Sequence, residues 1–177
     1  KGHLIGNKVV TTVMSNMGLE NYLKENGIAL LRANVADIYV IEKMLACEAA
    51  IGGEHTGHMI LMENVTTEDE ILISLKWVEA LSDEKQYIDE MIKDIKDWPQ
   101  KLINVTVDNK KKNIWNQNKN ITDFIALKEK EMEGLGRVLV RTSGTEPLVR
   151  VMVEGKDMSM VEKVVNEIVE IVKKELA

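Results

Sequence analysis

The first 80 residues alternate between short runs rich in β-branched residues and longer segments with helical patterning, and this alternation constrains the fold most. A run such as Lys8–Met14 (KVVTTVM) has the composition of a buried strand. Strands are expected over residues 8–14, 28–35, 50–51 and 59–62, and helices over 17–25, 37–49 and 68–81. Alternating strands and helices favour a mostly parallel sheet with right-handed crossovers.

Capping residues separate these elements. Ser15 and Asn16 stand where the first helix should begin, and Asn26 and Gly27 stand where a left-handed residue would end it. Asp37 is expected to cap the second helix, and Thr66 or Thr67 the third.

The pattern changes near Ser82. A charged amphipathic helix is expected over 83–97 and should end before Pro99, because the residue preceding a proline avoids helical geometry. Further strands are expected over 102–107, 137–141 and 148–153, and further helices over 121–132 and from Asp157 onward. A short turn joins the last two strands, which is typical of a small α+β domain with an antiparallel sheet.

The final helix carries its apolar residues at helical spacing, so one face should be buried. These residues are Val161, Val164, Val165, Ile168 and Val172. The preceding Lys- and Asn-rich stretch 108–120, with Lys110–Lys112, is expected to be a mobile, solvated surface segment. We therefore predict two domains, an N-terminally incomplete three-layer α/β domain over 1–82 and an α+β domain over 83–177.

Charge and composition exclude several classes of protein. The chain has 23 Lys and Arg against 29 Asp and Glu, a formal charge of -6, and lacks the basic footprint of a nucleic-acid binder. It has no apolar run of the ~18 residues that a membrane span needs. The single cysteine, Cys47, cannot form an internal disulfide, which favours a cytoplasmic location. Because the first residue is Lys1 rather than Met, we expect a piece of a longer chain.

One loop has the chemistry of an anion site. The segment Arg141–Pro147 (RTSGTEP) offers hydroxyl groups, a glycine whose backbone a ligand can approach, and a guanidinium that can grip an oxyanion with two parallel hydrogen bonds. Arg150, on the following strand, could add a second cation. An ordinary hairpin turn uses the same residue types, so composition alone leaves both interpretations open.

A second loop lies between two short expected strands, over Gly52–His58 (GGEHTGH). Glu54, Thr56 and His58 alternate, so an extended segment would point them the same way, where they suit sugar hydroxyls. A metal site built from Glu54, His55 and His58 is an alternative, but its spacing matches no standard zinc pattern. A hairpin with structurally hydrogen-bonded histidines is the other alternative.

Taken together, the loops resemble the α-D-phosphohexomutase superfamily, most closely the bacterial phosphoglucosamine mutases. Arg141–Arg150 (RTSGTEPLVR) resembles the phosphate-binding loop of the fourth domain of that family. Gly53–His58 (GEHTGH) resembles the sugar-binding loop of its third domain, and Val13–Leu19 (VMSNMGL) a segment near the start of the third domain's sheet. The order and spacing of all three agree with the family, so the resemblance covers essentially the whole chain.

The resemblance implies an isomerase of amino-sugar and cell-wall precursor synthesis. Such an enzyme interconverts glucosamine 6-phosphate and glucosamine 1-phosphate through a bisphosphorylated sugar. A phosphoserine in the first domain donates the phosphoryl group, and an aspartate loop in the second holds Mg²⁺. Neither loop is present here, so the chain alone is expected to be inactive and to need the missing N-terminal domains of the same enzyme as partners. Whether the protein forms a homo-oligomer is left open.

The resemblance also implies roles for individual residues. Glu54 and Thr56, with His58 beside them, would contact the sugar, and Thr56 stands where a serine is more usual. The phosphate would be held by Arg141, Ser143, Gly144, Thr145 and Arg150.

The sequence departs from the family at Val35–Val40 (VADIYV), where these mutases usually read Gly-Asp-Arg-Tyr. Ala36 replaces the glycine, and Ile38 replaces an arginine with a side chain that cannot pair with phosphate. His55 replaces a common glutamine. Two alternatives follow, a non-catalytic sugar-phosphate-binding module and a related phosphomannomutase or phosphoglucomutase.

Overall fold

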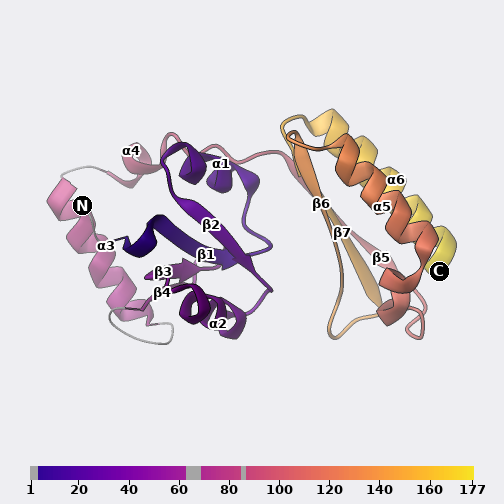
Figure 1. The fold of residues 1–177 in the computed structure, drawn as a ribbon, viewed down its shortest axis with the longest axis horizontal. Helices are drawn as coiled ribbons and strands as arrows, with labels where there is room; N and C mark the ends of the chain where they lie inside the picture. The colour runs from indigo at the N-terminus through magenta and orange to yellow at the C-terminus, as the bar shows by residue number, and fades with distance from the viewer. Residues whose placement is uncertain (1–3, 63–68, 85–86) are drawn as a thin grey trace. The chain divides into compact units, whose positions relative to one another are not determined.

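A computed structural model describes residues 4–62, 69–84 and 87–177 (Figure 1). The chain forms two compact units, Lys1–Asp97 and Trp98–Ala177. The predicted domains, 1–82 and 83–177, divide inside helix α3 (Glu70–Glu84), and the two compact units divide after Asp97.

The sheet of the first unit is mostly parallel, as predicted. It contains β1 (Lys8–Thr12), β2 (Ala29–Ala33), β3 (Ile51–Gly53) and β4 (Met59–Leu61) in the order β2-β1-β3-β4. β1 pairs in parallel with both β2 and β3, whereas β3 and β4 form an antiparallel hairpin.

The helices of this unit are α1 (Met17–Glu25), α2 (Asp37–Cys47), α3 and α4 (Ile88–Ile92), preceded by a short 3-10 turn at Ile5–Asn7. Of the two residues expected to cap α1, Ser15 and Asn16, the cap is Asn16, because its side chain accepts a hydrogen bond from the Gly18 N–H at 2.7 Å.

Two helix predictions for the first unit are wrong. Asp37 is the first residue of α2 rather than its cap; the capping position is Ala36, which has no side chain able to accept a hydrogen bond. The long helix expected over 83–97 is absent, because α3 extends to Glu84 and only the short α4 follows. The expected caps Thr66 and Thr67 lie outside the described residues.

Helix α2 packs on one face of the sheet, where Val10, Val40, Met44 and Ile60 are at most 1% exposed. Gly52 lies on the same face, and a Cβ there would collide with the Met44 and Val40 side chains, so only glycine lets α2 approach so closely.

Helix α1 covers the other face of the sheet. Arg32, on β2, donates to the Ser15 carbonyl at 2.6 Å and to Glu20 of α1 at 2.8 Å. The first unit is therefore a sheet between helices, as the predicted three-layer α/β class requires.

The second unit is an antiparallel sheet with helices on one side (Figure 1). Its strands are β5 (Gln100–Thr106), β6 (Gly136–Thr142) and β7 (Leu148–Gly155), in the order β5-β7-β6. Helices α5 (Lys119–Glu131) and α6 (Met158–Leu176) lie side by side along it. The predicted α+β class is confirmed.

The core of the second unit lies between this sheet and the two helices. All five apolar residues predicted to face it from α6 are buried: Val161, Val164, Val165, Ile168 and Val172. Most residues of 108–120 are exposed, as expected of a surface segment, but the expectation that Lys110–Lys112 is a solvated run is wrong at Lys112. Residues Lys112–Gln117 form a 3-10 helix (η2), whose Trp115 packs against the core and whose Lys112 is only 8% exposed.

Among the helices that the structure describes, none combines the length and the apolar character that crossing a membrane would require.

The capping residue of α6, Asp157, should make the stability of the fold depend on pH. Hydrogen bonds from the Ser159 hydroxyl and the Met160 N–H lower the pKa of Asp157. Asp157 therefore stabilises the fold above its unfolded-state pKa, and this stabilisation is lost as the pH falls through its lower folded-state pKa. We expect Asp157→Asn to be less stable near neutral pH and to lose less stability on acidification, as measured by urea unfolding between pH 2 and pH 6. Asp123→Asn, which removes a carboxylate from α5, is the control. Parallel pH curves for the wild type and Asp157→Asn would contradict the prediction.

Candidate functional site

The loop between β6 and β7 is a hairpin turn closed by backbone and side-chain hydrogen bonds. The Ser143 N–H donates to the Leu148 carbonyl at 2.9 Å, and the Leu148 N–H to the Glu146 carbonyl at 2.8 Å. The Ser143 hydroxyl accepts from the Glu146 N–H at 3.2 Å, and Ser143 as a residue is only 3% exposed. The loop therefore has a defined shape that its own residues maintain.

Two arginines face each other at the base of this loop. The β6–β7 register pairs Arg141 directly with Arg150, which places two like charges opposite one another on neighbouring strands. Burial lowers the pKa of Arg141, and the positive charge of Arg150 lowers it further. Within the described part of the chain, the buried Nε of each arginine has no hydrogen-bond partner. Such a pair is stabilised by an anion.

The tip of the loop is open. A Cβ added at Gly144 would meet no atom within 4 Å, and the backbone there is not in a left-handed conformation. Neither the Gly144 nor the Thr145 backbone N–H has a hydrogen-bond partner among the described residues. Glycine at this position is thus required neither by packing nor by backbone geometry, and it leaves N–H groups accessible to a ligand.

Lys112 supports the loop from η2, and the sequence analysis missed it. Its ammonium group donates to the Glu146 carbonyl at 3.0 Å. A lysine within a run of three lysines is ordinarily solvated, so no sequence pattern distinguished Lys112 from Lys110 and Lys111. The contact adds a further positive charge beneath the loop.

The second candidate loop connects β3 and β4. The Glu54 N–H donates to the His58 carbonyl at 2.9 Å, and the Gly57 N–H to the Glu54 carbonyl at 3.1 Å. Gly57 has φ 102°, a conformation that glycine adopts easily. The loop is therefore a tight turn, not the extended segment that the alternation argument assumed.

The turn nevertheless brings two of the predicted sugar-binding groups together. The Thr56 hydroxyl donates to Glu54 Oε2 at 3.4 Å, and the other carboxylate oxygen, Oε1, accepts from the Ala36 N–H at 3.1 Å. His58 is exposed at the end of the turn. A carboxylate oriented from both sides can bind a pair of sugar hydroxyls.

Ala36 holds an unusual backbone conformation, with φ 139° and ψ 146°. This region is populated almost only by glycine, so the alanine is strained. The conformation aims the Ala36 N–H at Glu54 just before α2 begins. The resemblance expected glycine at this position, and the backbone retains the glycine geometry although the residue has changed.

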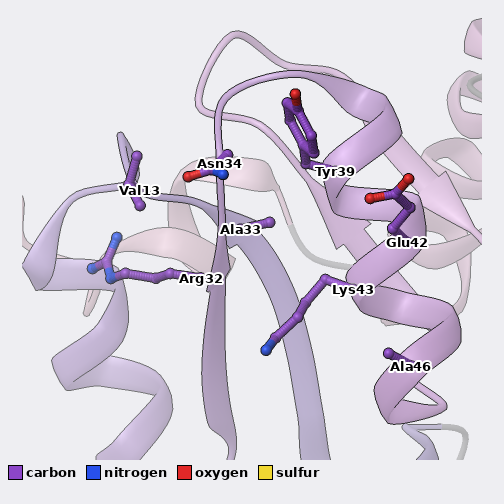
Figure 2. Close-up of a pocket in the computed structure, with 8 residues that line it drawn as sticks. All are labelled: Val13, Arg32, Ala33, Asn34, Tyr39, Glu42, Lys43 and Ala46. Carbon is purple, nitrogen blue, oxygen red and sulfur yellow. The ribbon is translucent and has the colours of Figure 1, made fainter. Parts of the chain in front are cut away.

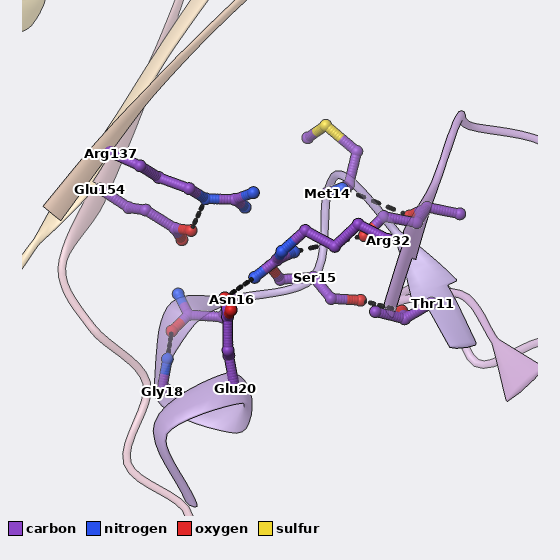
Figure 3. A network of polar contacts seen from close by, with 10 residues as sticks. Thr11, Met14, Ser15, Asn16, Gly18, Glu20, Arg32, Arg137 and Glu154 are labelled. Carbon is purple, nitrogen blue, oxygen red and sulfur yellow. Dashed lines mark hydrogen bonds and ion pairs between the residues drawn. The ribbon is translucent and has the colours of Figure 1, made fainter. Parts of the chain in front are cut away.

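A polar network holds the segment that follows β1 (Figure 3). The Thr11 and Ser15 hydroxyls are hydrogen-bonded to each other, and the Met14 N–H donates to the Thr12 hydroxyl at 3.3 Å. Arg32 closes the network through the Ser15 carbonyl. In the second unit, the same figure shows Arg137 paired with Glu154, a carboxylate that is fully buried.

An open pocket of about 390 Å³ lies between β2 and α2, lined by Arg32, Asn34, Tyr39, Glu42 and Lys43 among others (Figure 2). The Arg32 charge is already balanced by Glu20. Lys43 and Glu42 have opposite charges, so the pocket has no net charge that would select a ligand.

Among the described residues, no three His, Cys, Asp or Glu side chains are grouped so that they could hold a metal ion.

Two family models together match nearly the whole chain. Residues 1–98 match the family model for phosphoglucomutase/phosphomannomutase, alpha/beta/alpha domain III, and residues 102–171 match the model for the C-terminal domain of the same enzymes. The chain belongs to the phosphoglucomutase/phosphomannomutase family.

Within this family the chain is most informatively compared with phosphoglucosamine mutases. It is 55% identical over 176 residues to the enzyme of Fusobacterium nucleatum and 44% identical to that of a Thermoanaerobacter species. Each match covers 99% of this chain but only 39% of the relative.

Solved structures show the same phosphohexomutase fold. The chain superposes with a TM-score of 0.75 and 18% identity on an N-acetylphosphoglucosamine mutase of Aspergillus fumigatus, a serine-to-alanine variant solved in complex with glucose 1,6-bisphosphate. It superposes with a TM-score of 0.71 and 22% identity on an N-acetylglucosamine-phosphate mutase in its substrate complex. Both superpositions cover 94% of this chain and 38% of the other.

The strain at Ala36 can be tested by substitution. We expect Ala36→Gly to raise the free energy of unfolding of this phosphohexomutase chain by about 1 kcal/mol, because released strain of about 1–3 kcal/mol exceeds the roughly 0.4–1 kcal/mol lost to glycine flexibility in the unfolded chain. Urea denaturation followed by circular dichroism would measure the free energy of unfolding of both proteins. The control, Ala46→Gly within α2, should lower stability by about 1 kcal/mol. Equal destabilisation by both variants would show that Ala36 is not strained.

Proposed function

We propose that the chain is the part of a phosphoglucosamine mutase that holds the sugar and the phosphate that is not being transferred. The proposal rests on the 55% identity to a named phosphoglucosamine mutase and on the two loops described above. The single observation that carries it is the facing pair Arg141 and Arg150, whose buried Nε groups have no partner among the described residues beside an open Ser-Gly-Thr turn.

The reaction consists of two phosphoryl transfers with one reorientation between them. An enzyme phosphoserine gives its phosphoryl group to O1 of glucosamine 6-phosphate, which produces the 1,6-bisphosphate. The bisphosphate then turns, and the serine oxygen takes the phosphoryl group from O6 and leaves glucosamine 1-phosphate. At each transfer the other phosphate must be held in place, since correct positioning supplies much of the catalysis of phosphoryl transfer.

The loop of the second unit suits this holding role. Arg141 and Arg150 would neutralise the phosphate charge, while the Ser143 hydroxyl and the Gly144 and Thr145 N–H groups would donate hydrogen bonds to its oxygens. None of these groups distinguishes a 6-phosphate from a 1-phosphate, so the same cradle can serve both halves of the reaction. In the first unit, Glu54 and Thr56, with His58, would bind the sugar hydroxyls.

The proposed reaction would use Mg²⁺, and the described residues of this chain include no group of three His, Cys, Asp or Glu side chains that could hold it. Its ligands and the phosphoserine are expected in the part of the relatives that this chain does not span, and these further domains are its proposed partners. A structural neighbour was solved with GlcNAc-6P and magnesium. We place the enzyme in the cytoplasm and in amino-sugar and cell-wall precursor synthesis.

The first test is phosphate binding by the 177-residue chain. We expect Arg141→Ala to weaken the affinity for inorganic phosphate by about tenfold or more, because a hydrogen bond to a charged group contributes roughly 1.5–3 kcal/mol. Gly144→Ala should also weaken binding yet leave the free energy of unfolding within about 0.5 kcal/mol, since the added methyl group meets only open space. NMR titration of the loop amides measures both variants.

The control is Lys163→Ala, which removes a positive charge from an exposed position of α6 and should leave phosphate affinity unchanged. If Arg141→Ala bound phosphate as tightly as the wild type, the loop would not be the phosphate site.

The second test is turnover. The 177-residue chain should convert no glucosamine 6-phosphate, even with added glucosamine 1,6-bisphosphate, whereas the full-length enzyme that contains it should produce glucosamine 1-phosphate, as followed by ³¹P NMR. Turnover by the chain alone would contradict the division of roles. A full-length enzyme that prefers mannose or glucose phosphates would be a related mutase, and one with no turnover on any of them would support a non-catalytic module.

A further inference from the structure

The carboxylate of Glu146 contacts two residues of the predicted phosphate site. Its Oε2 accepts a hydrogen bond from Arg150 Nη2 at 3.3 Å and lies 3.5 Å from the Ser143 hydroxyl oxygen. Both partners belong to the set predicted to hold phosphate. A carboxylate offers oxygen acceptors and negative charge, as a phosphate does, so it satisfies the same donors.

The backbone and the side chain of Glu146 are held very differently. Its carbonyl accepts from both the Lys112 ammonium and the Leu148 N–H, and its own N–H donates to Ser143. The side chain, in contrast, is 55% exposed and reaches Arg150 through a single contact. The carboxylate can therefore rotate into solvent without any change in the loop.

The geometry points to Glu146 as an internal counter-ion that phosphate must displace. Through its ion pair with Arg150 it offsets the repulsion between the facing Arg141 and Arg150 charges. When phosphate binds, two anions cannot share these donors, so the carboxylate leaves. Phosphate binding is consequently weaker, and phosphate release faster, than the two arginines alone would make them.

This inference rests on the proposal that the loop binds phosphate, and it assigns the contact between Glu146 and Arg150 a role in the reaction. The bisphosphorylated sugar must leave the cradle in order to turn, so a cradle that bound too tightly would stall the cycle. A carboxylate that returns to Arg150 as the phosphate departs lowers the cost of that departure.

The test compares inorganic phosphate binding by the wild-type chain and by Glu146→Gln, which keeps the size of the side chain and one acceptor oxygen but removes its charge. We expect Glu146→Gln to bind phosphate about two- to fivefold more tightly, the range that follows from a partly exposed ion pair. Line-shape analysis of the Ser143 and Gly144 amide signals should show slower phosphate release. A merely structural role for Glu146 would give weaker binding instead.

Glu170→Gln is the matched control. It removes the same charge from an exposed position of α6, where Glu170 pairs with Lys173 at 3.1 Å, and should not change phosphate affinity. An unchanged or weakened affinity in Glu146→Gln would overturn the inference. Arg141→Ala decides separately whether the loop binds phosphate, so a failure of the counter-ion role and a failure of the proposed function give different results.

Discussion

The pairing of Arg141 with Arg150 across β6 and β7 is the constraint on which the rest of the second unit's site depends. The antiparallel register puts two positive charges directly opposite each other, an arrangement that costs free energy unless an anion is near. A third cation, Lys112, lies beneath the same loop. The carboxylate of Glu146 offsets part of this positive charge. In the proposed reaction, a bound phosphate would displace that carboxylate.

In the first unit, the corresponding constraint is the positioning of one carboxylate, that of Glu54, in the turn between β3 and β4. The glycines of β3 and of the turn allow α2 to pack tightly and the chain to reverse within a few residues. Glu54 is then oriented from two sides, by the Thr56 hydroxyl and by the backbone N–H of Ala36. The second of these contacts requires a conformation that alanine adopts only under strain.

Much of the fold could be predicted because its elements are locally consistent. β-Branched runs became strands, Asn16 and Asp157 stand at the starts of helices as expected, and the helical spacing of the α6 valines correctly identified the buried face. The predictions failed where local signals were weak. The amphipathic pattern over 83–97 suggested one helix, whereas α3 ends at Glu84 and only the short α4 follows among the described residues; in the Lys-rich segment before α5, one lysine is buried.

The sequence by itself determined the fold class and the residue types of both loops, because strand and helix patterns and the RTSGTEP and GEHTGH segments are local properties of the chain. Only the tertiary structure decided which groups meet. Strand register set Arg141 against Arg150, a 3-10 turn brought Lys112 under the loop, and the start of α2 brought Ala36 to Glu54. The Lys112–Glu146 and Ala36–Glu54 contacts join residues 34 and 18 positions apart, so no pattern within either segment could specify them. Arg150 was expected as a second cation, but its alignment directly opposite Arg141 depends on the strand register.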